Sequence, residues 1–515
     1  MFSGISAKGS APGASRNTVV PLASVRAQHC VYKESEMYPH YETDKLLVSC
    51  VPSPRQLRHA RMEFYGFICF NVNTFTDREW GTGKESPSIF APTEYDPAQW
   101  IDAAADAGMT GIILICKHHD GFCLWPSRYT EHSVKNSPLA SGRGDVVRDV
   151  SEECRKRGLK FGVYLSPWDM HEPSYGQGKP YDDYFCAQLT ELLTEYGPLF
   201  SVWFDGACGE GPNGKKQVYD WDRYYALIRE YQPDACISIC GPDVRWCGNE
   251  AGDTRESEWS VLPAAFDSPE EVAEKSQKED STAFREKKID MTERDLGSRE
   301  FLRGAKGLRW YPAETDTSIR PGWFYHEAED DRVRSAGVLL DIWYRTVGGN
   351  SSLLLNIPPD RRGLFHENDV RSLRELGARI RSIFAVNLAE NAVFTADRGD
   401  GIHTADALRV DSYDAFYKPC DGENAAAVTI RLPEAADVTH VVIKEHIPMS
   451  QRVERFAVDV LLPGETPGGA WREVAAGTTI GYKRIARFDA VRTEAVRVRI
   501  TDSRVCPVLS FIGIY

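Results

Sequence analysis

In the stretch LFSVWFDG, residues 199–206, a carboxylate and a glycine directly follow an apolar and aromatic run. Such a run predicts a buried strand. It belongs to a series in which apolar runs alternate with amphipathic segments joined by short connections that contain glycine. This order predicts a parallel sheet of the α/β class. The predicted strands are 64–72, 111–116, 161–165, 199–204 and 235–239, and the predicted helices are 97–107, 145–157, 182–196 and 221–231.

A sheet of this kind can close as a barrel or stay open and doubly wound. The length of the chain and the positions of its polar residues favour a (β/α)-barrel, TIM-like catalytic domain over 61–384, closed by a helix at 367–383. Residues 1–60 lack sustained periodicity and predict an irregular N-terminal extension. Over 385–515 the pattern changes to short alternating runs, which predict an antiparallel β-sandwich. These runs are 427–432, 440–444, 456–461 and 496–500.

The composition argues against several classes of partner. The net charge of -14 would repel phosphate backbones and anionic membranes, so neither nucleic acid nor a membrane is expected as a partner. The first thirty residues lack the continuous apolar segment of a signal peptide, so we expect a soluble protein that is cytoplasmic or exported by a signal absent from this chain. The 13 cysteines form no CxxC pair, which predicts free buried thiols and no structural zinc site.

Polar residues follow four consecutive predicted strands at the point where each strand ends. They occupy 117–120, 166–169, 205–206 and 241–250. In a barrel enzyme the chemistry lies on the loops after the strands, so these four segments are expected to meet at one mouth.

Asp205 has two interpretations: a catalytic nucleophile directly after a buried strand, or the cap of the next helix. Glycoside hydrolysis needs a second carboxyl group. The residues alone do not choose among the candidates after the fifth predicted strand, although Trp246 and Gly248 beside Glu250 suggest partial desolvation and a raised pKa. These candidates are Asp243, Glu250, Asp253, Glu256 and Glu258.

The pair His118-His119, followed by Asp120, has three interpretations: metal ligands, core residues or partners of sugar hydroxyls. Neighbouring histidines at a strand end are expected to point in opposite directions, and no further histidine cluster completes a metal site. We therefore favour binding of sugar hydroxyls, for which a neutral imidazole has one donor and one acceptor. Tryptophans in or near the predicted loops would suit a deoxy-sugar with a methyl group, or be ordinary core residues. They are Trp80, Trp125, Trp168, Trp203, Trp246, Trp259 and Trp323.

Taken together, six motifs in order resemble the α-L-fucosidases of glycoside hydrolase family 29. The resemblance runs from about residue 64 to residue 515. The motifs are NTFTDREWG (73–81), KHHDGF (117–122), WFDG (203–206), RWCGNE (245–250), RPGWFY (320–325) and LLLNIPP (353–359).

The resemblance implies a retaining double displacement on a fucosylated oligosaccharide or glycoconjugate, without a metal or organic cofactor. Asp205 would be the nucleophile and Glu250 the acid/base. The motifs at 73–81 and 245–250 look more like the subgroup that prefers α-1,3 and α-1,4 fucosyl branches, as in Lewis-type glycans. Residues implied to bind fucose are His118, His119, Glu79, Trp80, Tyr164, Trp203 and, as a weaker candidate, Trp323.

Cys69 departs from the family pattern, which usually has histidine there, so one sugar hydroxyl would lose a strong partner. The C-terminal part, with GYKRI at 481–485, resembles the family's carbohydrate-binding-like domain and has either a structural or a binding role. Alternative functions are a broader α-fucosidase, another retaining glycosidase such as one acting on α-galactosides, a metal-dependent hydrolase, and a non-catalytic carbohydrate-binding protein.

Overall fold

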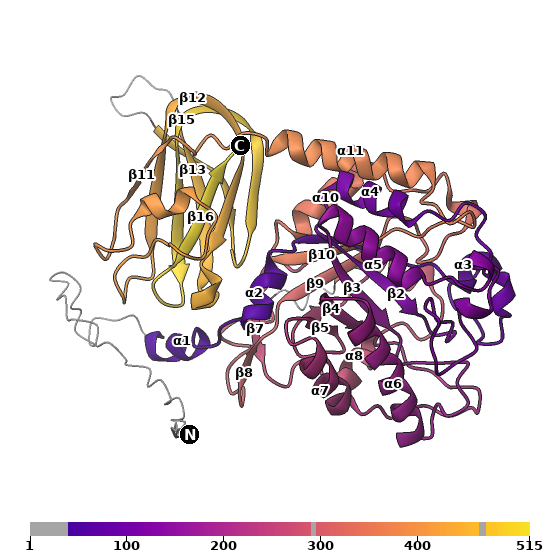
Figure 1. Cartoon of the computed structure of the whole chain (residues 1–515). Coiled ribbons are helices and arrows are strands. Elements are labelled where there is room, and N and C mark those ends of the chain that lie inside the picture. The colour runs from indigo at the N-terminus through magenta and orange to yellow at the C-terminus, as the bar shows by residue number, and fades with distance from the viewer. Residues whose placement is uncertain (1–39, 290–294, 463–469) are drawn as a thin grey trace, which may run out of the picture.

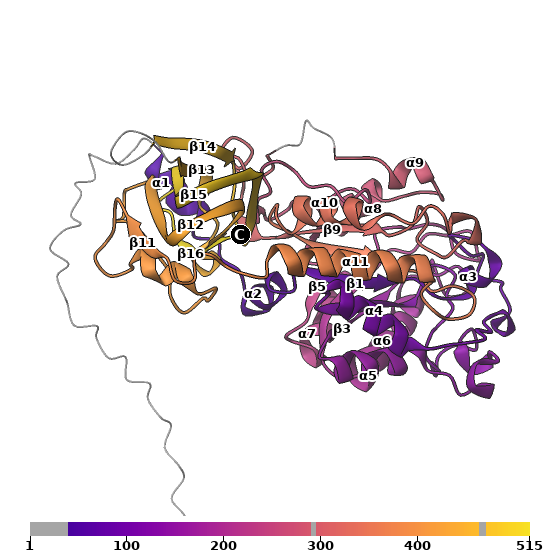
Figure 2. The same cartoon turned by 90° about the horizontal axis from the view of Figure 1, so that it is seen from above.

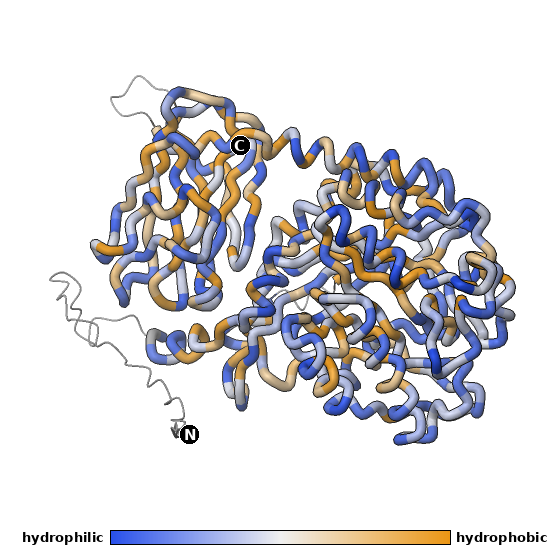
Figure 3. Tube along the Cα trace, viewed as in Figure 1, coloured by the Kyte–Doolittle hydropathy of each residue, from blue (hydrophilic) through white to orange (hydrophobic). Residues whose placement is uncertain are grey.

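A computed structural model of the protein describes residues 40–289, 295–462 and 470–515. The chain forms a helix-covered parallel sheet followed by a smaller part made of antiparallel strands (Figure 1). Seen from above, the long helix α11 (Glu367–Ile383) runs along the first part towards the second (Figure 2). Hydrophobic residues concentrate on the strands of both parts, whereas the outer helices carry many hydrophilic ones (Figure 3).

The first part is a nearly closed eight-stranded barrel, which confirms the predicted fold class. Its strands follow the order β5-β4-β3-β2-β1-β10-β9-β6, and every neighbouring pair is parallel. A bridge between Ser238 and Val244 links the two edges. The strands are β1 (Phe64–Ile68), β2 (Gly111–Lys117), β3 (Lys160–Leu165), β4 (Leu199–Phe204), β5 (Cys236–Ile239), β6 (Arg245–Trp246), β9 (Ala313–Ser318) and β10 (Ser351–Asn356).

The helices between the strands begin and end at residues suited to those positions. The side chains of Asp96, Asp145 and Asp220 accept backbone N–H bonds at the starts of three helices. Gly108 and Gly158 end two of them in the left-handed conformation, at φ 88° and 76°. The barrel helices are α4 (Pro97–Ala107), α5 (Val146–Arg157), α6 (Lys179–Glu195), α7 (Trp221–Tyr231) and α10 (Ala336–Thr346).

The regular alternation stops after β5, because residues 240–244 form no helix before β6. A long insertion then precedes β9. It contains the antiparallel pair of β7 (Val261–Pro263) and β8 (Leu308–Trp310), with the helices α8 (Pro269–Lys275) and α9 (Thr282–Arg285) between them. The predicted strand 64–72 is also too long: Asn71 caps the short helix α3 (Val72–Thr76).

The prediction of an irregular N-terminal extension is wrong for residues 41–60, which contain α1 (Tyr41–Leu47) and α2 (Pro54–Ala60). Ser53 and Gln56 form a capping box at the start of α2. The Gln56 side chain also donates to the backbone oxygens of Asp243 and Trp310, both at 2.8 Å. Contacts distant in sequence therefore hold α2 against the barrel. Residues 1–39 lie outside the described residues.

The second part contains antiparallel strands in the order β11-β12-β15-β13-β14, with β16 paired to β12. The runs 427–432 and 440–444, predicted as two strands, are the two halves of β12, which shifts register between Arg431 and Ala436. A boundary near residue 385 stays a prediction. The strands are β11 (Val393–Ala396), β12 (Ala426–Glu445), β13 (Val453–Leu462), β14 (Ala470–Gly477), β15 (Arg484–Ser503) and β16 (Leu509–Ile514).

Two other expectations from the composition can be compared with the fold. Most free cysteines in the described residues are buried, but Cys420 is disulfide-bonded, so the prediction of free thiols is wrong there. In the part of the chain that the structure describes, no helix combines the length and apolarity needed to cross a bilayer.

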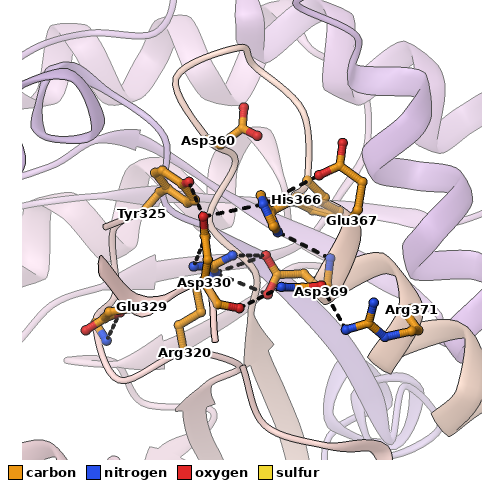
Figure 4. Close-up of polar contacts among 12 residues, drawn as sticks. Arg320, Tyr325, Glu329, Asp330, Asp360, His366, Glu367, Asp369 and Arg371 are labelled. Carbon is orange, nitrogen blue, oxygen red and sulfur yellow. Dashed lines mark hydrogen bonds and ion pairs between the residues drawn. The ribbon is translucent and has the colours of Figure 1, made fainter. Parts of the chain in front are cut away.

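A buried ion pair joins α11 to the segment that follows β9 (Figure 4). Arg320 and Asp369 are both fully buried, and the guanidinium contacts both carboxylate oxygens at 2.9 to 3.1 Å. Removing Asp369 would leave the buried guanidinium of Arg320 with the partly exposed carboxylate of Asp330, 2.9 Å away. We therefore expect Asp369→Ala to lower the free energy of unfolding by about 3 kcal/mol, the lower end for a broken buried pair, measured by urea unfolding.

Glu375→Ala, on the exposed face of the same helix, is the matched control. Glu375 pairs with Arg379, and both side chains are about half exposed. Solvent screening makes such a pair worth less than about 1 kcal/mol. Equal losses in the two variants would show that the buried pair adds nothing.

Candidate active site

Residues from several strand ends line one pocket at the mouth of the barrel. They come from β1, β2, β3, β4, β5, β6 and β9 and from the segments after several of these strands, as expected for the C-terminal face of a barrel. Eight of the nine predicted site residues line this pocket, and Glu79 does not. The eight are Trp80, His118, His119, Tyr164, Trp203, Asp205, Glu250 and Trp323.

Asp205 lies directly after β4 with its carboxylate facing the pocket. Its Oδ2 accepts the Tyr164 hydroxyl at 2.8 Å, and its Oδ1 accepts the Ala207 N–H at 2.8 Å. Burial raises the pKa of Asp205, and these donors oppose that effect by favouring the charged form. The helix-cap interpretation is wrong, because Asp220 caps the next helix.

Gly206 supplies the space that the site needs beside the carboxylate. A Cβ atom at this position would lie 2.3 Å from Ser276 Oγ, just beyond α8. Ser276 itself lines the pocket. The insertion between β6 and β9 therefore packs closely over the end of β4, and a side chain at position 206 would push it away.

Glu250 is the one of the five candidate carboxylates that lines the pocket. Asp243 and Glu258 are buried in ion pairs with arginines. Asp253 lies 3.5 Å from the guanidinium of a further arginine. Glu256 is exposed to solvent. Glu250 is therefore the candidate for the second carboxyl group of the site, because the other four side chains lie elsewhere.

The surroundings of Glu250 favour its protonated form. Burial raises the pKa of Glu250 to about 7, and the negative charge of Asp205 adds to the rise. The Trp323 indole N–H donates to Glu250 Oε2 at 2.8 Å, and this hydrogen bond opposes the rise in pKa. Because Oε2 accepts this bond, the acidic proton of Glu250 belongs on Oε1. The two carboxyl groups therefore differ: Asp205 accepts two donors that favour its anion, whereas the pKa of Glu250 is raised to about 7.

His119 has a defined tautomer. Its Nδ1 lies 2.7 Å from Ser166 Oγ, and Ser166 donates its own hydrogen to the Trp168 carbonyl at 2.7 Å. Nδ1 must therefore carry the hydrogen and donate. Burial lowers the pKa of His119 to about 3, so the ring is neutral and Nε2 is an acceptor, 3.9 Å from Asp205 Oδ2. A substrate hydroxyl can donate to it.

His118 lines the same pocket, so the expectation that the two rings point in opposite directions is wrong. Their centroids are 4.0 Å apart. A register shift between Ile115 and Lys117 breaks the strict alternation of side chains at the end of β2. Burial lowers the pKa of His118 well below its ordinary value, and among the described residues its Nδ1 has no hydrogen-bond partner.

A metal-binding interpretation finds no support in the arrangement of side chains. Within residues 40–289, 295–462 and 470–515, no three His, Cys, Asp or Glu side chains are grouped so that they could hold a metal ion. Cys69 lies in the pocket as expected from its position. Burial raises the pKa of its thiol well above the ordinary value, so the group is neutral.

Two buried carboxyl groups on β9 escaped the sequence reasoning. Asp316 lines the pocket and accepts the Trp246 indole N–H at 2.8 Å. Glu314 accepts the Trp203 indole N–H at 2.6 Å and the Tyr65 hydroxyl, and burial raises its pKa to about 7. The alternation AETDTS at 313–318 was the available signal, because every second side chain of a strand points to the same face.

Glu79 does not line the pocket, but it binds the segment that carries the pocket residue Trp323. Its carboxylate accepts the backbone N–H groups of Trp323 at 2.8 Å and Phe324 at 3.1 Å. It also contacts His326 Nε2 at 2.8 Å. With its oxygens occupied in this way, Glu79 holds the segment that carries Trp323.

Comparison with known proteins identifies the family. A family model described as alpha-L-fucosidase matches residues 58–382. The chain belongs to the α-L-fucosidase family. It is a glycoside hydrolase that acts on α-L-fucosides. Alpha-L-fucosidase 1 of Arabidopsis thaliana is 38% identical to it over 471 residues, which cover 90% of this chain and 87% of the plant protein.

Solved structures agree with this α-L-fucosidase assignment. A glycoside hydrolase 29 family member from an unknown rumen bacterium is 36% identical, with a TM-score of 0.73, and the match covers 90% of this chain and 77% of that one. A Ruminococcus gnavus GH29 fucosidase in complex with fucose is 28% identical, with a TM-score of 0.75, and the match covers 90% and 95% of the two chains.

Proposed function

We propose that this α-L-fucosidase is a retaining exo-enzyme that removes terminal α-1,3- or α-1,4-linked L-fucose from Lewis-type branches. The observation that carries the mechanism is the pairing of Asp205 and Glu250 in one pocket, where two donors favour the anion of Asp205 and burial raises the pKa of Glu250 to about 7. A retaining glycosidase needs this division into a nucleophile and an acid.

In the proposed first step, Asp205 attacks the anomeric carbon while Glu250 Oε1 gives its proton to the departing glycosidic oxygen. This step leaves fucose as an ester on Asp205. Glu250, now an anion, takes a proton from water, which attacks the same carbon and breaks the ester. Two inversions return the starting configuration. Tyr164 steadies Asp205 through its 2.8 Å hydrogen bond.

The remaining pocket residues would hold the sugar. His119 Nε2 would accept a hydrogen bond from one sugar hydroxyl, and His118 offers a second neutral imidazole. Phe67, Ile115 and the indole of Trp203 give the pocket an apolar wall for the C6 methyl group. In a galactoside this methyl would carry a hydroxyl group, which the apolar wall would leave without a partner.

Two observations favour branched glycans. The motifs at 73–81 and 245–250 resemble the α-1,3/1,4 subgroup. A second hollow, lined by Trp246, Cys247, Asn249 and Phe284, borders the Glu250 segment. The leaving group departs next to the proposed acid, Glu250. The neighbouring hollow therefore offers room for a second sugar of a branched aglycone.

Parallel digestion of a Lewis-type trisaccharide and of 2'-fucosylated lactose tests the proposal. We expect fucose from the trisaccharide at a rate at least about tenfold higher than from the linear substrate, equivalent to about 1.4 kcal/mol of transition-state binding. Proton NMR is expected to show α-L-fucose as the first product. Equal rates would favour the broader-specificity α-fucosidase, and β-L-fucose as first product would contradict retention. Aryl α-galactoside serves as the comparison for another retaining glycosidase.

A further inference from the structure

His326 lies between two carboxylates that approach its ring from opposite sides. Its Nδ1 is 2.8 Å from Asp77 Oδ1, and its Nε2 is 2.8 Å from Glu79 Oε1. Glu79 also accepts two backbone N–H groups, and the Asp77 side chain is 59% exposed to solvent, so both serve as acceptors. A neutral imidazole has only one N–H. Donation to both carboxylates therefore requires the imidazolium form.

The charges around His326 agree with this conclusion. Hydrogen bonds to Glu79 and Asp77 raise its pKa to about 9, against the opposing effect of burial. Glu329 adds a further negative charge. The opposing cation, Arg285 of α9, lies 3.9 Å from Glu79 Oε2. His326 therefore stays charged throughout the neutral pH range.

The contacts of His326 join two segments of the pocket wall. Asp77 and Glu79 precede Trp80 on the segment after α3, whereas His326 follows Trp323 on the segment after β9. Both tryptophans line the pocket.

The segment after β9 is also held from its other side (Figure 4). Arg320 contacts Asp330 Oδ1 at 2.9 Å, and the Tyr325 hydroxyl donates to Asp330 Oδ2 at 3.1 Å. Arg320 itself is anchored to Asp369 of α11. On the Trp80 side, the contacts of His326 add to the two backbone N–H bonds that Glu79 accepts from Trp323 and Phe324.

We propose that His326 is a positioning residue for the fucosidase reaction, which bridges Asp77 and Glu79 as an imidazolium and thereby keeps the Trp323 N–H on Glu250 Oε2. The inference rests on Glu250 as the acid/base of the proposed function. Holding Oε2 as an acceptor places the acidic proton on Oε1, from which it is transferred. Loss of this donor removes a bond that stabilises the Glu250 anion, so the pKa of Glu250 rises further.

The test compares His326→Gln, Trp323→Phe and the double variant by the pH profile of kcat/KM on a fucosylated glycan. Both single variants are expected to move the alkaline limb upward by about one pH unit, because the acid stays protonated to higher pH. His326→Gln is also expected to lower kcat by about tenfold. If His326 acts through Trp323, the double variant moves the limb no further than either single one.

His403→Gln is the matched control. His403 also contacts a carboxylate, with its Nδ1 2.6 Å from Asp400 Oδ2, but it lies in the part of the chain after α11. Its pH profile is expected to equal that of the unmodified enzyme. Asp77→Asn changes only the solvent-exposed partner of His326. It therefore tests the same bridge with less disturbance of the fold. It is expected to shift the limb in the same direction by less.

An unmoved alkaline limb in both His326→Gln and Asp77→Asn overturns the proposal, as does a double-variant shift equal to the sum of the single shifts. Thermal unfolding of each variant checks that the fold is retained.

Rescue of Glu250→Ala by azide distinguishes a failure of the acid/base assignment from a failure of the positioning role. If azide does not rescue it, the acid/base assignment is wrong. If azide rescues it and the His326→Gln limb stays in place, the positioning role alone is wrong.

Discussion

Asp205→Ala is expected to lower the rate of fucose release by more than roughly 10³-fold, because the proposed mechanism needs this carboxylate to form the fucosyl ester. The substitution keeps the apolar wall and the neighbouring histidines of the pocket. It leaves the Tyr164 hydroxyl and the Ala207 N–H without their acceptor. Binding of fucose should therefore survive better than catalysis, so the loss should fall mainly on kcat.

Azide gives this prediction a positive readout. A small anion can enter the space left by the carboxylate and attack the anomeric carbon from the same face. One inversion then yields β-L-fucosyl azide, which NMR distinguishes from the hydrolysis product. Glu210→Ala, an exposed carboxylate on the loop after β4, is the control and should keep full activity. If Asp205→Ala retains more than about a tenth of the activity, the nucleophile lies elsewhere.

Glu250→Ala is expected to slow cleavage of a natural glycan by about 10²- to 10⁴-fold, the usual contribution of general acid catalysis. An aryl fucoside with a good leaving group should lose less in the first step, because its oxygen departs without a proton. Azide should restore turnover of the ester and give α-L-fucosyl azide, since it replaces water in the second inversion. Glu256→Ala changes an exposed carboxylate on the same segment and is expected to leave the cleavage rate unchanged.

The pH dependence follows from the same residue. Burial raises the pKa of Glu250 to about 7, and the proposed reaction needs its protonated form. Activity on glycans should therefore be present below about pH 7 and fall as the pH rises through that value. This alkaline limb should disappear in Glu250→Ala. A limb that persists in the variant would assign the titration to another group.

Several parts of the fold could be predicted from the sequence because they are set locally. An apolar run of strand length, a capping aspartate and a terminal glycine appear within a few residues of one another, as around α4 and α5. The pocket position of Asp205 follows from the same logic. A residue that directly follows a parallel strand is placed at the barrel mouth by the strand itself.

Other features depend on contacts between distant segments and left no apolar pattern. Helix α2 is held to the barrel through Gln56, whose partners lie 187 and 254 residues away in sequence. Strand β9 contains polar residues because its inward side chains meet Trp203 and Trp246 inside the barrel. An apolar pattern cannot reveal a strand of this kind.

The parallel α/β order, the antiparallel C-terminal strands and a carboxylate at a strand end could be predicted from the sequence, since each follows from short-range order along the chain. Which of the five candidate carboxylates shares the pocket with Asp205 depends on tertiary contacts. The tertiary structure also placed Glu79 behind the wall, with its oxygens occupied by the segment after β9. The physical reason is that a carboxyl group is an acid, an ion-pair partner or a structural acceptor according to the donors, charges and burial around it, and distant segments of the chain supply those surroundings.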